Sequence, residues 1–282
     1  MPKKQVYHRW SPTLGGGFAG TPEEVWGTLP YDPDRHINED VVYCGLYGLP
    51  DFYSLWRHKG KKYIWWCGSD ITHFVNGYWL DTSGSIRLDP RVMAKWISKN
   101  CDSWVENEVE SKALGELGIK TQRCPSFLGN IDDYEVSFKP GNKVYTSVSG
   151  DDFKLYGWHL IPELALRNPD IEFHLYGNNK EWISPNTWNS RNIVVHGRVS
   201  QEQMNKEIKE MQGALRLTEF DGCSELIVKA MLWGQYAFSL IEYPFIDKID
   251  KIKLLPTWLP NMIGRNWWIK NLNKYPWNQK LQ

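Results

Sequence analysis

The segment from Thr218 to Gly234 constrains the fold of this chain more than any other part of the sequence. It stands between two short apolar runs, 213–217 and 236–241, that have the length and composition of buried strands. Between these runs a polar loop with one glycine leads into an apolar helix, with Ser224 as the expected N-cap and Glu225 in the first turn. The order of strand, loop, helix and strand predicts a parallel α/β sheet. The loop before the helix is where such a sheet binds an anion.

The same alternation of strands and helices continues through the rest of the chain. Strands are expected at 5–10, 40–45, 61–67, 103–107, 121–127, 143–149, 171–177 and 192–197, and helices at 49–58, 89–100, 108–117, 155–167 and 200–211. Such alternation indicates parallel sheets with right-handed crossovers. The polar, glycine- and proline-containing stretch 128–142 is the best domain boundary. We therefore expect an N-terminal domain at 1–130, a linker at 131–142 and a C-terminal domain at 143–260.

The composition excludes several classes of protein. Lys plus Arg and Asp plus Glu both number 33, so no overall field attracts the chain to nucleic acid, and no nucleic-acid partner is expected. Five cysteines without a CxxC pair favour a reducing compartment. No apolar run is long enough to span a bilayer, and the N-terminus lacks the apolar core of a signal peptide. These features predict a cytoplasmic protein.

Aligned on the run from Lys229 to Gly234, the opening segment resembles the retaining GT-B glycosyltransferases (group 1, family 4-like). These enzymes carry there a Glu, seven residues, then a second Glu that opens an Ala-Met-x-x-Gly run. Asp221 stands at the first Glu position and Lys229 at the second, so one carboxylate is shortened and the other is replaced by a cation. The resemblance implies an α/β, GT-B-like fold, with two Rossmann-like domains facing across a cleft and a trimmed N-terminal domain.

The second half of the sequence resembles the donor domain of this family over nearly its whole length. The segments Pro169–Gly177 and Asn192–Ser200 match two strands of that domain. Lys154 matches a family lysine that contacts the donor diphosphate. A family arginine before that lysine has no clear counterpart, and Arg198 and Arg216 remain the alternatives for supplying its charge.

Transfer from a nucleotide sugar leaves a diphosphate with growing negative charge, which helix N-terminal amides and basic side chains stabilise. The resemblance implies Asp221 as a catalytic carboxylate near the donor sugar. It also implies a set of donor-binding residues: Lys154, Arg198, Glu219, Gly222, Cys223, Ser224, Glu225 and Lys229. No Asp-x-Asp stands in a plausible metal position and no His/Cys cluster has ligand spacing, so we expect no metal site, no cofactor and no essential Mg²⁺.

A protonated lysine at position 229 has no capacity to accept hydrogen bonds from ribose hydroxyls. Two alternatives follow for Lys229. It contacts a phosphate of the donor, or it pairs with Glu225 one helical turn earlier.

Two more candidates come from the first half of the chain. Gly16 and Gly17 follow the first strand and permit close backbone approach to a ligand. The family often has a glycine-rich loop here that faces the donor phosphates, and a flexible loop without a ligand is the alternative. Asp70 follows the third strand, which in the family lines the acceptor side, and is a candidate for proton transfer. An Asx turn at the end of the strand is its alternative.

The C-terminal segment 261–282 interleaves Trp267, Trp268 and Trp277 with basic residues. We expect it to pack back on the N-terminal domain as a C-terminal helix. The alternative is a peripheral membrane anchor for a lipid-linked acceptor. A single-strand nucleic-acid surface is a third alternative that the neutral overall charge disfavours.

The sequence therefore predicts a metal-independent glycosyltransferase that moves a sugar from a nucleotide-sugar donor to a glycan, lipid-linked or other acceptor. Retention of anomeric configuration is implied by the resemblance alone. A catalytically silent GT-B-like protein that binds a glycan or partner is the first alternative, because Lys229 replaces an acidic residue. A nucleotide-sugar epimerase is the second.

Overall fold

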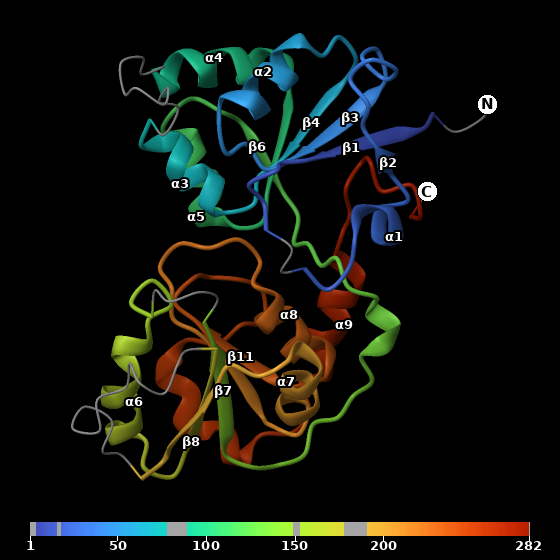
Figure 1. Ribbon diagram of the computed structural model, residues 1–282. Helices are drawn as coiled ribbons and strands as arrows, with labels where there is room; N and C mark the ends of the chain where they lie inside the picture. Colours follow the sequence, from blue (N-terminus) through green and yellow to red (C-terminus); the bar gives the residue numbers. More distant parts are fainter. Residues whose placement is uncertain (1–3, 16–17, 78–88, 149–152, 178–190, 282) are drawn as a thin grey trace. The chain divides into compact units, whose positions relative to one another are not determined.

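The computed structural model describes residues 4–15, 18–77, 89–148, 153–177 and 191–281. The chain divides into two compact units. Unit 1 comprises Met1–Asn130, Phe220–Cys223 and Asn271–Gln282, and unit 2 comprises Ile131–Glu219 and Ser224–Lys270. Each unit contains a parallel sheet with helices, as the alternation in the sequence predicts (Figure 1).

The sheet of unit 1 has six strands in the order β2-β1-β3-β4-β5-β6, all paired in parallel. The strands are β1 (Val6–Trp10), β2 (Leu29–Pro30), β3 (Asp40–Cys44), β4 (Lys62–Trp65), β5 (Asp102–Val105) and β6 (Thr121–Arg123). Side chains alternate between the two faces along β3: Val41 and Tyr43 enter one core, and Val42 and Cys44 enter the other. Both faces are buried, which explains why these strands are continuous apolar runs in the sequence.

Four helices cover one face of this sheet (Figure 1). They are α2 (Leu49–Arg57), α3 (Ser69–Val75), α4 (Pro90–Asn100) and α5 (Glu108–Gly115). The predicted cap of α4 is confirmed, because the Asp89 side chain accepts a hydrogen bond from the Arg91 amide and Pro90 occupies the first turn. Helix α3 was not expected from the sequence, which indicated only a turn around Asp70.

The other face of the unit 1 sheet carries an aromatic core. It is covered by α1 (Pro22–Trp26) and by the last residues of the chain, and Trp26 and Trp277 are fully buried there. Trp277 stacks on Tyr275 with ring centroids 4.4 Å apart and meets Trp104 edge-on. Residues 271–282 are thus an integral part of unit 1.

The sheet of unit 2 has five parallel strands in the order β11-β10-β7-β8-β9. Its strands are β7 (Lys143–Ser147), β8 (Glu172–Tyr176), β9 (Ile193–Gly197), β10 (Gly213–Arg216) and β11 (Tyr236–Ser239). Its helices are α6 (Ile161–Arg167), α7 (Gln201–Ile208), α8 (Glu225–Leu232) and α9 (Met262–Asn271), with 3₁₀ turns η1 (Ile131–Asp133), η2 (Trp158–Leu160) and η4 (Ile249–Thr257). Apolar residues of β7, β10, β11, α6 and η4 form the main core of this unit.

The stretch 131–142, expected as a linker, belongs to unit 2. Tyr134 and Phe138 bury their rings, and the Ser137 amide donates to the Trp233 carbonyl at 3.0 Å. Polar residues around these two rings gave the stretch the composition of a linker, but two buried aromatic rings are enough to fix it against the unit.

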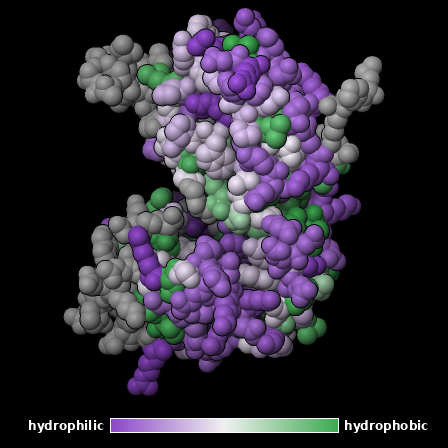
Figure 2. All heavy atoms as spheres, turned by 45° about the vertical axis from the view of Figure 1, so that its right-hand side comes forward, coloured by the Kyte–Doolittle hydropathy of each residue, from purple (hydrophilic) through white to green (hydrophobic). Residues whose placement is uncertain are grey.

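The C-terminal tryptophans are largely enclosed by protein. Trp268 and Trp277 are fully buried, and the Trp268 indole donates to the Pro244 carbonyl at 3.0 Å. No helix in the described part of the chain is long and apolar enough to cross a membrane. The face in Figure 2 is mainly hydrophilic, with apolar residues in small separate patches.

Candidate functional site

The order of strands in unit 2 has a topological switch point between β7 and β10. From β7 the chain moves through α6 to β8 on one side, whereas β10 pairs with β7 on the other side. In open parallel sheets, ligands bind at the carboxyl ends of the strands where the connections diverge in this way. The residues that follow β7 and β10 are therefore the first candidates for a binding site.

Basic side chains follow both of these strands. Lys154 lies in the exposed turn after β7, and Arg216 is the last residue of β10. The Arg216 guanidinium lies over the ring of Tyr156, with Cζ 4.6 Å from the ring centroid. Because Tyr156 and Lys154 are in the same turn, this contact connects the loops after β7 and β10. Of the two arginines that the sequence left open, Arg216 is the one at this position in the sheet.

Arg198 occupies a different place. It follows β9, at the edge of the sheet two strands from β7, and its Nε donates to the Gly177 carbonyl at 3.0 Å. Its exposed guanidinium connects the ends of β8 and β9. The structure therefore separates Arg198 from the pair formed by Lys154 and Arg216.

Helix α8 begins directly after the loop that follows β10. Ser224 is its N-cap residue, as predicted, but its side chain makes no capping hydrogen bond. Lys229 is 4% exposed, and its Nζ lies 3.3 Å from Glu225 Oε2 one turn earlier. The structure thus contains the ion pair with Glu225 within α8 that was one of the two alternatives for Lys229. Glu219, before the loop, is exposed.

The segment Phe220–Cys223 makes its contacts in unit 1. The Cys223 amide donates to Glu106 Oε2, and the Ser126 hydroxyl donates to the other oxygen of the same carboxylate. Asn107 Nδ2 donates to the Asp221 carbonyl at 2.7 Å. Gly222 fits closely, because a Cβ there would lie 2.2 Å from Glu106 Oε2. The backbone of Asp221 is therefore held by residues at the carboxyl end of β5.

Glu106 and Glu110 form a buried carboxylate pair beneath this segment. Glu110 Oε2 accepts from the Glu106 amide at 2.7 Å, and Glu110 Oε1 has no hydrogen-bond partner in the described part of the chain. Burial raises the pKa of Glu106 to about 7, although the hydrogen bonds from Ser126 and Cys223 lower it. Burial and the Glu106 charge raise the pKa of Glu110 well above its usual value. Sequence analysis did not identify this pair; the Asn107-x-x-Glu110 spacing indicates only the helix start that it forms.

Asp70 lies in the first turn of α3 and is fully buried. Its two carboxylate oxygens accept hydrogen bonds from the amides of Leu46, Cys67 and Ile71 at 2.9–3.0 Å. Burial raises its pKa to about 7 although these bonds favour the ionised form. A side chain with three backbone partners and no solvent exposure fits the structural alternative, a turn-forming aspartate, better than proton transfer to an acceptor.

The remaining predictions are placed as follows. Gly16 and Gly17 lie outside the described residues. Among the described residues, no group of three or more His, Cys, Asp or Glu side chains is arranged to hold a metal ion. Of the predicted donor-binding residues, Lys154, Ser224, Glu225 and Lys229 are in unit 2 with Arg216, whereas Gly222 and Cys223 are in unit 1 with the predicted catalytic residue Asp221.

Comparison with known proteins gives similarity at the level of the fold. No protein-family model matches the sequence, and no curated protein matches it. Solved structures do match. Sucrose-phosphate synthase from Thermosynechococcus elongatus has a TM-score of 0.58 at 11% identity, over 86% of this chain and 71% of that one.

Two further structures are similar to the chain. A TarM variant from S. aureus, solved with fondaparinux, α-GlcNAc-glycerol and UDP, has a TM-score of 0.51 at 14% identity over 83% of this chain. This chain spans about half (51%) of the length of that protein. HepE from Anabaena, solved with UDP and glucose, has a TM-score of 0.52 at 11% identity over 99% of this chain and 98% of that one. The two parallel sheets with interleaved helices, together with these neighbours, establish that the chain has an α/β fold of the GT-B type.

Proposed function

We propose that this chain is a glycosyltransferase that moves a sugar from a nucleotide-sugar donor to a glycan or other acceptor. The observation that carries the proposal is the position of Lys154 and Arg216 after β7 and β10, at the place in the unit 2 sheet where connections diverge. The neighbours with bound UDP support a uridine nucleotide as the first donor to test.

The proposed chemistry depends on charge at the leaving group. As the glycosidic bond to the donor breaks, negative charge grows on the diphosphate, and cations that are already in place stabilise it without reorganisation. Lys154 and Arg216 would supply this charge in unit 2, and the first turn of α8 would add backbone amides and a favourable dipole. Two cations in these positions would take the place of a divalent ion, so we propose a metal-independent reaction.

The finer assignments are also proposals. Asp221 would approach the donor sugar as the catalytic carboxylate, with its backbone fixed by Asn107. Lys229 would act through Glu225, orienting that carboxylate instead of touching the ribose. Retention of anomeric configuration is proposed from the resemblance of the segment from Asp221 to Gly234 to the retaining GT-B enzymes.

The experiment is nucleotide binding measured by calorimetry, with UDP, GDP, ADP, dTDP and CMP, with and without Mg²⁺. We expect one diphosphate to bind without metal. Lys154→Met and Arg216→Gln should each weaken it at least about tenfold, the loss of a charge-assisted hydrogen bond. Lys206→Met, an exposed lysine on α7, is the matched control and should bind as the parent does.

A catalytically silent protein of the same fold is the second candidate, favoured by the pairing of Lys229 with Glu225 where the family has an acidic residue. Binding of a nucleotide without turnover of any nucleotide sugar would favour this candidate. Absence of binding by all five nucleotides would contradict the transferase proposal and favour a silent protein that binds a glycan or partner. Conversion of the donor sugar in the absence of any acceptor would instead indicate an epimerase.

A further inference from the structure

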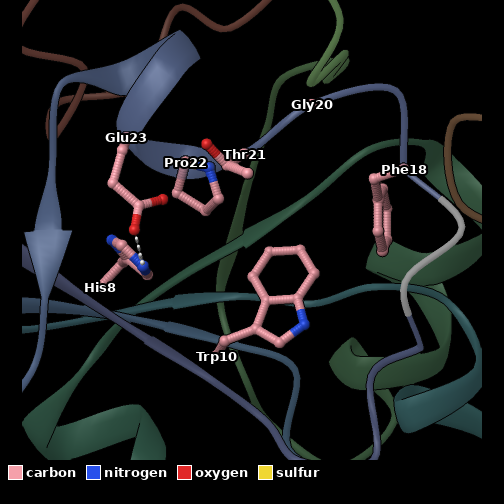
Figure 3. Close-up of a pocket in the computed structure, with 7 residues that line it drawn as sticks. All are labelled: His8, Trp10, Phe18, Gly20, Thr21, Pro22 and Glu23. Atoms are coloured by element: carbon pink, nitrogen blue, oxygen red, sulfur yellow. Dashed lines mark ion pairs between the residues drawn. The ribbon is translucent and has the colours of Figure 1, made fainter.

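A pocket lies within unit 1, beside the start of α1. It has a volume of about 430 Å³ and is lined by His8, Trp10, Phe18, Gly20, Thr21, Pro22 and Glu23. This volume falls in the range of about 300–1,000 Å³ that is usual for small-molecule sites. Figure 3 shows His8 and Phe18 on opposite sides of the Trp10 indole, with Thr21 and Pro22 across from it.

The aromatic walls of the pocket are fixed by packing. Trp10 and Phe18 meet edge-on with centroids 5.2 Å apart, and Trp10 also contacts the buried Trp65. The Trp10 Nε1–H donates to the Leu14 carbonyl at 3.0 Å, so the indole offers the pocket an apolar surface and no spare donor. Flat rings held in this way suit the apolar C–H faces of a ligand ring.

The polar side of the pocket presents hydrogen-bond acceptors. His8 Nδ1 lies 3.0 Å from Thr28 Oγ1, whose hydroxyl has the Pro22 carbonyl as its acceptor at 3.4 Å. His8 Nδ1 donates to the Thr28 oxygen in one tautomer and accepts from the Thr28 hydroxyl in the other. Burial lowers the pKa of His8, which keeps the imidazole neutral at pH 7.

The other ring nitrogen of His8 faces a carboxylate. His8 Nε2 lies 3.5 Å from Glu23 Oε1, and the His8 side chain is 7% exposed, whereas that of Glu23 is 41% exposed. A carboxylate has two oxygens and about four lone pairs, so Glu23 keeps acceptor capacity beside His8 in either tautomer. A ligand hydroxyl or ammonium group would use this capacity.

The pocket wall is built by specific local structure. The Thr21 side chain and Glu24 form a capping box at the start of α1. Gly20 approaches Leu128 so closely that a Cβ there would lie 2.2 Å from its carbonyl oxygen. These contacts hold Thr21, Pro22 and Glu23 in place without a ligand.

We propose that this pocket binds one pyranose ring of an uncharged or amine-bearing saccharide. Trp10 and Phe18 lie against the ring, and Glu23, beside His8, accepts hydrogen bonds from its hydroxyls or amine. No lysine or arginine is among the described residues that line the pocket, so the carboxylate of Glu23 disfavours a phosphorylated sugar by charge repulsion. The identification of this saccharide as the acceptor rests on the proposed transferase function.

The test is binding by saturation-transfer NMR and calorimetry to the full chain, with maltotriose, chitotriose, glucosamine and glucose 6-phosphate as probes. We expect at least one of the first three to bind and glucose 6-phosphate not to bind. Glu23→Gln should weaken binding at least about tenfold, with the largest effect for glucosamine, since it removes a charge-assisted bond. Trp10→Ala should abolish binding.

Matched controls are Glu116→Gln and Trp56→Ala, which change an exposed carboxylate and an exposed indole elsewhere in unit 1. Circular dichroism checks that each variant folds. If Trp10→Ala does not fold, the saccharide affinity of Glu23→Gln is the test of the proposal. No binding of any saccharide, equal binding by Glu23→Gln, or preference for the phosphorylated sugar would each overturn the proposal. Nucleotide binding by the same samples is read separately, so loss of the saccharide site and failure of the transferase proposal give different results.

Discussion

Lys229 and Glu225 lie one turn apart on α8, with Nζ of the lysine 3.3 Å from Oε2 of the glutamate. The lysine side chain is 5% exposed and the glutamate side chain 22% exposed. Removing one partner of an ion pair that is this buried lowers the stability of the protein, because it leaves a charge with little solvent around it. The cation at position 229 is therefore part of how α8 holds the carboxylate of Glu225.

Lys229→Met should destabilise the protein by about 1–3 kcal/mol, because it keeps the volume of the side chain and removes the cation that pairs with Glu225. Thermal unfolding of this variant, with exposed Lys253→Met as control, measures the effect. If Lys229→Met is as stable as the control, the pair contributes nothing to α8.

Lys229→Glu tests the family pattern in the same helix. It places two carboxylates one turn apart, and like charges at this spacing destabilise a helix. We expect lower stability and weaker nucleotide binding than in the parent chain. Tighter nucleotide binding by Lys229→Glu would instead indicate a former site in which the acidic residue was lost.

Gly222 and Gly115 offer a matched pair of glycine substitutions. Gly222→Ala places a Cβ 2.2 Å from Glu106 Oε2, which must shift away from the Cys223 amide, and should cost about 1–3 kcal/mol. Gly115→Ala, at the end of α5, meets no atom within 4 Å and should be neutral or stabilising. Equal unfolding temperatures of the two variants would contradict the close fit of the segment Phe220–Cys223.

The buried carboxylates of unit 1 predict a pH dependence of stability. The folded-state pKa values of Asp70 and Glu106 are raised to about 7, and that of Glu110 is raised well above its usual value by burial and by the Glu106 charge. Between the unfolded values near 4 and the folded values, the folded state binds more protons than the unfolded state. The free energy of unfolding therefore falls as the pH rises through this window.

Glu110→Gln removes one of these groups and keeps an oxygen for the Glu106 amide. It should reduce the fall in the free energy of unfolding between pH 5 and pH 8. It should also raise the unfolding temperature at pH 8 by about 2–4 °C, which corresponds to about 1 kcal/mol. Glu116→Gln, exposed at the end of α5, is the control. Identical pH profiles for Glu110→Gln and the parent would exclude Glu110 as a contributor.

Trp277 anchors the C-terminal residues in the aromatic core of unit 1. It is fully buried, and its indole Nε1 has no hydrogen-bond partner among the described residues. Trp277→Ala should cost about 3–5 kcal/mol of stability, whereas Trp277→Phe, which keeps a ring and removes the unpaired donor, should cost less than about 1.5 kcal/mol. Urea unfolding measures both, and similar losses in the two variants would mean that ring packing does not hold this segment.

Local patterns in the sequence predicted most of the secondary structure. The strand expected at 143–149 is β7 (Lys143–Ser147), and the helix expected at 89–100 is α4 (Pro90–Asn100). The sequence does not predict helix α3, because Gly68 and Asp70 are typical turn residues; in the structure its Ile71 and Phe74 pack in the core of unit 1.

By itself, the sequence determined the parallel α/β class and the strand–loop–helix at Ser224, because apolar periodicity and helix caps act between residues close in the chain. The GT-B type of fold was implied by the resemblance to a known family. Tertiary structure alone decided which charges meet. It joined Arg216 to the turn of Lys154, put Glu106 against Cys223, and placed His8 beside Glu23. These contacts depend on strand order and on burial, which join residues distant in the sequence and which no spacing along the chain encodes.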